Sequence, residues 1–495
     1  MYLILKKVAF AVGGLFLPAV LFISGLFFLF KIGGAVFSPR FLRRVLAREK
    51  MGDKELHLRS DTKRKGVKNN TSSSFSSLCL ALAGTLGVGN ISGVTAAIMI
   101  GGPGTVFWIW VSAIVASVLK YAETVLAIHY RARDGSGEPC GGAHLYIKKG
   151  LNAPVVANLF CIICVITSFF MGCITQTRAA ADGVYVSSGI SPVICGIAFF
   201  AIVLYLSLGG GDRISRLTLR LIPPLCLVYI CLSLAVIFIF RENIFYVTKM
   251  ILTDAFSPKA GVLGFLFSPA MRYGVTRGIM SNEAGCGTAP MAYAKAESVS
   301  PARQGIYGIA EVLCDTLLLC TLTAYTVLLS ETALSGGATE VAINSFASAL
   351  GNGVKPLLGV SVFLFALGSV AGWSFYGQES LKALGQGRKF LKIYGVLYAL
   401  SAFLGCVMPE NAVWELADLS ISLMAIINVG AVLLLSRDVV KITKGFSKNG
   451  KENGKMGVCG KKRRESKKDD YEKGVRRGKE NEKGENGKKN GSVIL

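Results

Sequence analysis

Histidine and recognisable catalytic motifs are what this sequence has least of. Its 495 residues include three histidines, too few for a histidine-rich metal centre. The sequence contains no HExxH, GxSxG or GK[ST] motif, which argues against a zinc protease, a serine hydrolase or a Walker-type nucleotide site. Most of the thirteen cysteines stand inside apolar runs, and no disulfide framework is recognisable. These absences argue against an enzyme, so we expect no catalytic residue, no cofactor and no transition-metal site.

Long apolar stretches dominate the chain instead. Apolar residues make up 52% of it and the mean hydropathy is +0.52, values typical of a membrane protein. About 20 apolar residues suffice to cross a bilayer. The sequence predicts an all-α polytopic membrane protein with eleven transmembrane helices, near residues 8–30, 75–102, 105–130, 155–185, 190–208, 219–240, 262–294, 306–329, 356–376, 390–408 and 413–435.

The positive charge lies mostly outside these spans. The formal net charge is +24, and basic residues gather at 40–68, 131–150, 209–220, 382–389 and beyond 441. Because cytoplasmic loops are enriched in Lys and Arg, the alternation predicts a protein of the plasma or inner membrane with its N-terminus outside and its C-terminus in the cytoplasm. We expect anionic lipid near the basic loop and tail, and no nucleic-acid partner.

The spans divide the chain into five segments. They are an N-terminal peripheral transmembrane helix (1–38), a basic cytoplasmic loop (39–74), a first five-helix repeat (75–241), a second five-helix repeat (242–436) and a basic tail (437–495). Since five is an odd number, the second repeat is expected to be inverted relative to the first. The tail has few apolar residues and is predicted to be disordered and cytoplasmic.

Two of the predicted spans contain an unusual number of helix breakers. The first includes LAGTLGVGNISGV (82–94) and the second RYGVTRGIMSNEAGCGTAP (272–290). Each glycine inside a helix costs on the order of 1 kcal/mol relative to alanine. Broken backbone at membrane depth is tolerated where it is buried in protein or lines a cavity. Broken spans at corresponding positions of two halves indicate the binding site of a secondary transporter.

These motifs, with GGPGTVFWIWVSA (101–113), KYAETVLAIHYR (120–131), LGSVAGWSFYGQE (367–379) and VWELADLSISLMAI (413–426), resemble the alanine/glycine:cation symporters. The resemblance runs from about residue 75 to residue 436 in the family's order and spacing. It implies a peripheral N-terminal helix followed by a 5+5 inverted-repeat core of the leucine-transporter (LeuT) type with two broken helices. It also implies that a small amino acid such as alanine or glycine is carried in with sodium.

An amino-acid substrate needs donors for its carboxylate, oxygen acceptors for its ammonium group and a wall for its side chain. Gln176 matches a glutamine that resembles a substrate contact in the family. The predicted substrate-binding residues are Gly87, Gly89, Asn90, Gln176, Ser281, Asn282 and Trp373. Tight helix packing is the alternative interpretation of the glycines, and an interface anchor that of Trp373.

The resemblance also implies a sodium site between the first break and the span that holds Ser369. The predicted cation-binding residues are Thr85, Leu86 and Ser369. Relatives often carry two adjacent hydroxyls where this chain has Gly368 and Ser369, so one ligand is expected to be missing. A hydroxyl that bonds back to its own helix is the alternative for Ser369.

Three acidic residues in the spans are candidates for proton coupling, because ionisable groups inside a membrane are usually functional. They are Glu123, Glu283 and Asp315. A proton-coupled transporter, or an uncoupled one with altered substrate choice, is therefore the alternative function. Two residues after the matched glutamine, where the family usually has asparagine, this chain has Arg178. It has two interpretations: a structural ion pair with Asp182, four residues on, or a change in the pocket and the substrate choice.

Overall fold

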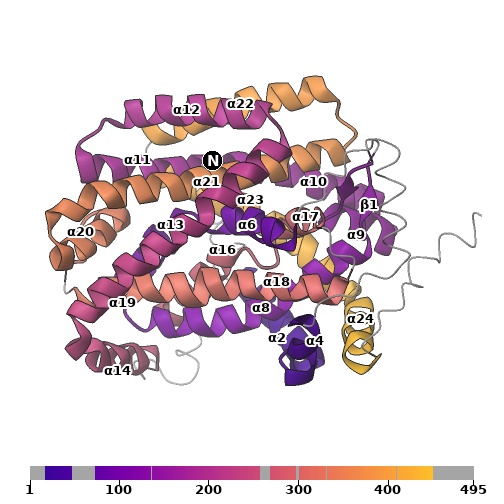
Figure 1. Cartoon of the computed structure of the whole chain (residues 1–495), viewed down its shortest axis with the longest axis horizontal. Coiled ribbons are helices and arrows are strands. Elements are labelled where there is room, and N and C mark those ends of the chain that lie inside the picture. Colours follow the sequence, from indigo (N-terminus) through magenta and orange to yellow (C-terminus); the bar gives the residue numbers. More distant parts are fainter. Residues whose placement is uncertain are drawn as a thin grey trace, which may run out of the picture. The chain divides into compact units, whose positions relative to one another are not determined.

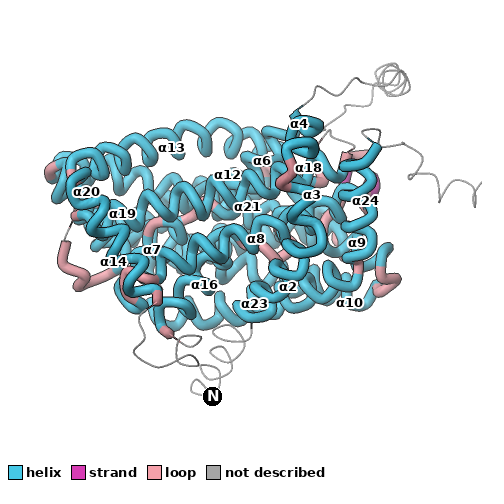
Figure 2. The backbone as a smooth tube through the Cα atoms, turned by 90° about the horizontal axis from the view of Figure 1, so that it is seen from below, coloured by secondary structure: helices cyan, strands magenta, loops and turns pink. Residues whose placement is uncertain are grey.

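The computed structural model describes residues 17–46, 73–134, 137–256, 268–296, 300–330, 332–408 and 410–449. These residues are nearly all helical (Figure 2). Among them, strand occurs as one short antiparallel pair, β1 (Ala132–Arg133) and β2 (Pro139–Cys140), in which Ala132 faces Cys140. The all-α prediction is therefore confirmed for the described chain.

The N-terminal region and the first half of the core are formed by consecutive helices (Figure 1). They are α2 (Leu17–Phe28), η2 (Leu29–Gly33), α3 (Gly34–Val36), α4 (Pro39–Leu46), α6 (Ser74–Thr85), η3 (Val88–Asn90), α7 (Ser92–Gly101), α8 (Thr105–His129), α9 (Ala143–Gly150), α10 (Pro154–Phe169), η4 (Phe170–Ile174), α11 (Thr175–Ser188), α12 (Pro192–Leu208), α13 (Gly211–Ile239), η5 (Arg241–Asn243) and α14 (Ile244–Ala255).

The second half follows the same pattern of long and interrupted helices. It contains α16 (Pro269–Asn282), α17 (Ala289–Tyr293), α18 (Pro301–Val312), η6 (Leu313–Cys320), α19 (Thr321–Leu329), α20 (Ala338–Leu350), η7 (Asn352–Val354), α21 (Lys355–Ala383), α22 (Arg388–Val407), α23 (Glu410–Leu434) and α24 (Ser436–Asn449).

Local sequence signals set where several of these helices begin. Proline stands in the first turn of α10, α12, α16, α18 and α21, where its missing N–H has no helical partner to lose. A serine hydroxyl caps the N-terminus of α6, α16 and α18: Ser73, Ser268 and Ser300 each accept a backbone N–H three residues on. These local signals account for where the helices begin.

Eight helices of the described chain are long and apolar enough to cross a membrane, or nine if the bent pair α6–α7 is one span. The pair is bent by 64° at its break. The predicted count of eleven is not established by this measure. The two predicted spans that it omits are α12, an apolar helix of 17 residues, and the interrupted pair α16–α17.

Glycines allow the broken span to pack closely on its neighbours. A β-carbon on Gly372 of α21 would lie 2.7 Å from the backbone nitrogen of Gly84 in α6. A β-carbon on Gly274 of α16 would lie 2.6 Å from Cβ of Trp108 in α8. Helix α6 therefore packs closely on α21, and α16 packs closely on α8.

Two predicted segments begin differently from what the sequence suggested. The tail, predicted to be disordered from residue 437, instead starts as helix α24, and residues 450–495 lie outside the described residues. Val439 and Phe446 of α24 are buried while Arg437, Lys441 and Lys444 are exposed, so an apolar stripe that the basic composition obscures holds this helix to the core.

The basic loop likewise starts as helix α4, and residues 47–72 lie outside the described part. The same is true of residues 1–16, which hold the first half of the predicted first span.

Candidate functional site

The first break frees backbone groups that a side chain from another helix satisfies. Helix α6 ends at Thr85, and the backbone N–H of Val88 donates to Oε1 of Gln176 in α11 over 3.0 Å. The two residues are 88 positions apart in the chain. Gln176 therefore contacts the first break directly, and both are buried.

Two of the predicted glycines differ sharply in the space around them. A β-carbon on Gly87 would collide with Oε1 of Gln176 and lie 3.1 Å from Cβ of Ser369. A β-carbon on Gly89 would have no heavy atom within 4 Å. A side chain at position 87 would therefore displace the carboxamide of Gln176, whereas open space adjoins position 89.

Ser369 reaches the first break from α21. Its hydroxyl donates to the backbone carbonyl of Gly84 over 3.0 Å, and the side chain is fully buried. Thr85 behaves differently, since its hydroxyl lies 3.3 Å from the carbonyl oxygen of Leu82 in its own helix. The hydroxyl of Ser369 and a carbonyl at the end of α6 therefore meet, while the side chain of Thr85 is turned back on its helix.

The second break is a run of left-handed backbone conformations. Glu283 ends α16 with φ of 50°, and Gly285 and Gly287 have φ of 88° and 77°. Glycine adopts such angles without steric cost, whereas a glutamate there is uncommon. Since strain of this kind is retained where the surroundings hold it, Glu283 is a candidate for a functional position.

The two breaks are joined by a buried network of hydrogen bonds. The hydroxyl of Ser281 lies 2.7 Å from both Oδ1 of Asn90 and Oδ2 of Asp315. Asn90 donates through Nδ2 to Oδ1 of Asp315 over 2.6 Å. The hydroxyl of Thr316 lies 2.8 Å from the same carboxylate. Asp315, on η6, therefore ties the first break to the last turn of α16.

Glu283 is held by two donors from different elements. Nε1 of Trp373 donates to Oε1 over 2.9 Å, and the Thr288 hydroxyl donates to Oε2 over the same distance. The Trp373 ring packs so tightly on Gly172 that a β-carbon there would collide with it. Trp373 is fully buried, so it is a positioning group for the second break and not an interface anchor.

Phenylalanine in place of Trp373 is expected to lower the initial rate of the amino-acid uptake that the sequence resemblance implies by about ten- to hundredfold, because Oε1 of Glu283 loses its buried donor. The matched control is Trp110→Phe, which removes an indole donor from Thr321 at the surface of α19. We expect this control to stay close to wild type. Equal rates for the Trp373 variant and wild type would contradict the positioning role.

Lys120 of α8 links the second break to α18. Its ammonium donates to the backbone carbonyl of Asn282 over 2.8 Å and lies 3.2 Å from Oε1 of Glu311. Tyr293 donates to the other oxygen of Glu311 over 2.8 Å. Lys120 and Glu311 are completely buried, so the pair belongs to the core of the site.

Glu123, three residues further along α8, faces the far end of the second break. Its Oε1 accepts the backbone N–H of Gly287 over 3.2 Å and a hydrogen bond from the amide of Asn428 in α23. Asn428 also donates to the carbonyl of Gly285 over 2.8 Å and accepts from the hydroxyl of Tyr146. Oε2 of Glu123 is buried without a hydrogen-bond partner in the described residues.

The structure brings most of the predicted residues into three groups. Gly87, Gln176 and Ser369 meet at the first break, and Asn90, Ser281 and Asp315 meet between the breaks. Trp373 and Glu283 form a third contact, while Asn282 instead bonds back to the carbonyl of Gly278 through Nδ2. Glu123 is not part of these contacts and instead accepts a hydrogen bond from Gly287 at the end of the second break.

Sequence reasoning missed Glu311 and Asn428. Glu311 stands in the predicted span 306–329, so the rule that selected Asp315 as an intramembrane acid could also have selected Glu311. Asn428 gave no comparable signal, because a single amide in an apolar helix is common. Its role depends on contacts with residues 143 and 305 positions away.

Arg178 forms the predicted ion pair with Asp182 over 2.7 Å and also contacts the end of a neighbouring helix. Its Nη1 donates to the carbonyl of Met408 over 3.0 Å and to that of Cys406 over 3.3 Å. These are the last carbonyls of α22, which have no partner within their own helix. Arg178 therefore caps the C-terminal end of α22 and at the same time pairs with Asp182. Both contacts are structural, which supports the ion-pair interpretation.

A polar cavity of about 190 Å³ lies beside the first half of the broken span. It is lined by residues that include Leu80 of α6, Ser215 of α13 and Phe375 of α21. Glu379 at its edge pairs with Lys382 over 2.8 Å and with Lys295 over 3.6 Å. This ion-pair group ties the end of α21 to the segment that follows α17.

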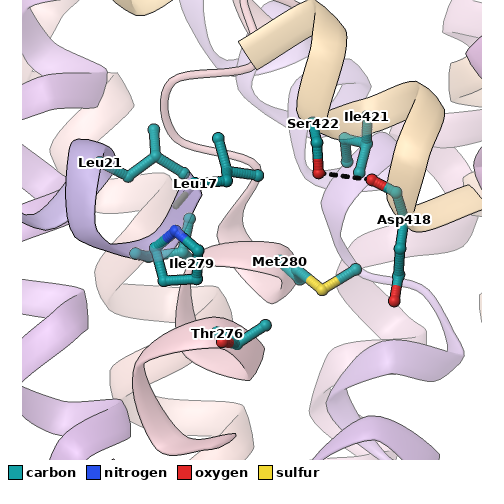
Figure 3. Close-up of a pocket in the computed structure, with 9 residues that line it drawn as sticks. Leu17, Leu21, Thr276, Ile279, Met280, Asp418, Ile421 and Ser422 are labelled. Atoms are coloured by element: carbon teal, nitrogen blue, oxygen red, sulfur yellow. Dashed lines mark hydrogen bonds between the residues drawn. The ribbon is translucent and has the colours of Figure 1, made fainter. Parts of the chain in front are cut away.

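A second, smaller cavity lies between α2, α16 and α23 (Figure 3). Its volume of about 10 Å³ is that of a single water position. The Ser422 hydroxyl there donates to the backbone carbonyl of Asp418 over 2.5 Å, and the rest of the lining includes Leu17, Leu21 and Met280. The cavity is too small for an amino acid, so it is not a substrate site.

Comparison with protein families gives one match over most of the chain. The model of the family described as "Sodium:alanine symporter family" matches residues 2–459. The "Sodium/alanine symporter AgcS" of Methanococcus maripaludis is 36% identical over 394 residues, which cover 77% of this chain and 86% of the relative. The "Probable sodium/glutamine symporter GlnT" of Bacillus subtilis is 32% identical over 384 residues, covering 77% and 80%.

Solved structures of other transporters share the fold. MhsT, crystallised in complex with L-phenylalanine, superposes with a TM-score of 0.56 at 12% identity, over 76% of this chain and 93% of MhsT. A manganese transporter of Eremococcus coleocola superposes with a TM-score of 0.51 at 14% identity, over 76% and 85%. At these identities the likeness concerns the fold alone, and it confirms the predicted LeuT-type architecture.

Proposed function

Because the chain belongs to the sodium:alanine symporter family, we propose that it imports alanine or glycine together with sodium by alternating access. Family membership makes the chain a membrane transporter and not an enzyme, and it supports secondary transport of amino acids. The substrate, the coupling ion and the direction are the proposal. Relatives named for alanine and for glutamine show that substrate choice varies among similar proteins.

The proposed topology has eleven spans with the N-terminus outside and the C-terminus in the cytoplasm. To the eight long apolar helices it adds the bent pair α6–α7, the shorter helix α12 and the broken pair α16–α17. Residues 75–241 and 242–436 are then two repeats of opposite orientation, and the first span of each is a broken helix. The basic loops support this orientation through the excess of Lys and Arg expected on the cytoplasmic side.

The contact between Ser369 and Gly84 is the observation that carries the sodium part of the proposal. A buried hydroxyl and a carbonyl from different helices lie 3.0 Å apart at the first break. Both are hard oxygen donors of the kind that a small cation prefers. In the proposed cycle the Ser369 hydroxyl turns its oxygen toward sodium, and carbonyls of Thr85 and Leu86 complete the site.

The substrate is proposed to bind between the two breaks. The backbone N–H groups near Gly87 and Asn90 would receive the carboxylate, as at other broken helices. The polar groups of Ser281 and Asn90 would take the rest of a small amino acid. Trp373, already fixed on Glu283, would bound the side chain.

Uptake of radiolabelled alanine into proteoliposomes tests this function. We expect accumulation above equilibrium with an inward sodium gradient, and none when potassium replaces sodium. Accumulation driven only by a proton gradient would overturn the proposed ion, and equilibration without accumulation would overturn coupling. Absence of alanine movement, with glycine and glutamine tested in parallel, would overturn the proposed substrate.

Alanine in place of Ser369 is expected to raise the sodium concentration for half-maximal uptake by about tenfold, since one oxygen ligand is lost. The apparent alanine affinity at saturating sodium should change less. Ser361→Ala is the matched control, because that hydroxyl on the same helix bonds back to the carbonyl of Leu357. An unchanged sodium dependence of the Ser369 variant would remove this residue from the ion site.

A proton-coupled mechanism is the second candidate, and one observation favours it. Glu123, Glu283 and Glu311 are all buried around the second break, and Lys120 is the one ammonium among the described residues that forms an ion pair with any of them, at Glu311. An unpaired carboxylate that is buried away from water raises the free energy of the protein. A carboxyl group avoids this cost by binding a proton. In the uptake assay, this mechanism predicts accumulation under an inward proton gradient without sodium.

A further inference from the structure

Three arginines on one face of α13 line an open hollow at the corner between α12 and α13. The hollow has a volume of about 480 Å³. Its lining consists of Tyr205 and Leu206 of α12 and of Arg213, Arg216, Leu217, Arg220 and Leu221 of α13. Spacings of three and four residues place the arginines on the same side of the helix. We call these seven residues the arginine face.

The length of α13 puts the arginine face at the depth of lipid headgroups. The helix has 29 residues, which at 1.5 Å per residue is about 43 Å, while the hydrocarbon core of a bilayer is about 30 Å thick. About nine residues therefore extend beyond the hydrocarbon. All three arginines lie in the first ten residues of the helix, and the rest of it is apolar, so this is the end that extends.

The charges of the arginines are not compensated by carboxylates of the described chain. The Arg213 guanidinium lies 4.0 Å from the centre of the Tyr205 ring and donates to the Tyr205 carbonyl over 2.5 Å. Arg216 donates to the backbone carbonyl of Asp212 over 3.3 Å. None of the ion pairs formed among the described residues includes Arg213, Arg216 or Arg220.

We propose that the arginine face binds the headgroup of an anionic phospholipid. Arg216 and Arg220, both exposed, hold the phosphate through the paired donors of their guanidinium groups. Arg213 is oriented by Tyr205 and adds the third charge. The acyl chains lie against Leu217 and Leu221 and continue over the exposed apolar residues of the same corner, which include Leu208, Leu219 and Leu227.

The surroundings of the hollow favour a lipid over a soluble anion. Leu208 is 50% exposed and Leu227 62% exposed, so apolar surface borders the guanidinium groups. A free phosphate ion would leave this surface uncovered, whereas a phospholipid covers both parts at once. A phosphate ion and a phospholipid both offer a phosphate group to the arginines, but the phospholipid also covers the apolar surface beside them.

Native mass spectrometry of the purified full-length protein tests the proposal. The protein is incubated in detergent with phosphatidylglycerol or with phosphatidylcholine at equal concentrations. We expect wild type to retain phosphatidylglycerol in preference to phosphatidylcholine. The double variant Arg216→Gln/Arg220→Gln should retain at least about tenfold less phosphatidylglycerol than wild type. Millimolar inorganic phosphate should not displace the lipid.

Two matched variants separate this site from general electrostatic attraction. Arg437→Gln/Lys441→Gln/Lys444→Gln removes three exposed positive charges from α24, and we expect retention to stay at the wild-type level. Arg216→Lys/Arg220→Lys keeps the charge and should restore part of the binding. Equal loss in the α24 variant, equal retention of both lipids, unchanged retention in the glutamine variant or displacement by phosphate would each overturn the proposal.

Discussion

Alanine in place of Gly87 is expected to abolish amino-acid uptake, while alanine in place of Gly89 leaves it close to wild type. The β-carbon at position 87 would enter the space of Oε1 of Gln176 and lie 3.1 Å from Cβ of Ser369. The contact of Gln176 with Val88 and that of Ser369 with Gly84 both depend on this close approach. Displacing groups at a reacting or binding centre by about 1 Å can cost about a hundredfold in rate.

The two variants differ by position alone, so each is the other's control for the change from glycine to alanine. Initial uptake rates in proteoliposomes are the measurement, and equal yield on size-exclusion chromatography shows that both proteins fold. Loss of uptake in both variants would mean that the substrate needs the space beside Gly89. Normal uptake by the Gly87 variant would show that the first break is not part of the site.

The existence and position of the two breaks could be predicted from the sequence because they depend on local composition. Four glycines around Asn90, and glycines with a proline after Ser281, cannot form regular helix at low cost. The structure indeed ends α6 at Thr85 and α16 at Asn282. The composition could not distinguish Gly87 from Gly89, since the difference lies in what other helices bring to each position.

Most of the contacts that could not be predicted from the sequence join residues that are far apart in the chain. Lys120 contacts residues 162 and 191 positions away, at Asn282 and Glu311. Nothing in the local pattern around Lys120 specifies which acidic residue it meets, and several lie in the neighbouring spans. The helix α24 was missed for a related reason, because its apolar stripe is too sparse to stand out in a basic segment.

The contacts of Lys120 stabilise the second break, and this role is separate from substrate binding. Glu283, Glu123 and Glu311 approach one another where α8, α18 and the break meet, and all three are buried. The Lys120 ammonium is the group that contacts both Glu311 and the end of α16. The strained backbone at Glu283 is therefore held by α8 through the carbonyl of Asn282 and by Trp373 through the Glu283 carboxylate.

Methionine in place of Lys120 is expected to destabilise the protein by about 3–5 kcal/mol, the usual cost of breaking a buried ion pair from one side. Glu311 would lose its cation, and the Asn282 carbonyl would lose its donor. Equilibrium unfolding in mixed detergent micelles measures the change. Lys382→Met is the control: that ammonium pairs with Glu379 over 2.8 Å but is 39% exposed. It should cost less than about 1 kcal/mol.

The double variant Lys120→Met/Glu311→Gln decides whether the effect comes from charge. Removing both charges leaves no unpaired ion at this contact, so most of the stability lost in the single variant should return. Tyr293 can still donate to the glutamine oxygen, which keeps the remaining hydrogen bond. If the double variant is no more stable than Lys120→Met alone, packing of the lysine chain and not its charge supports the second break.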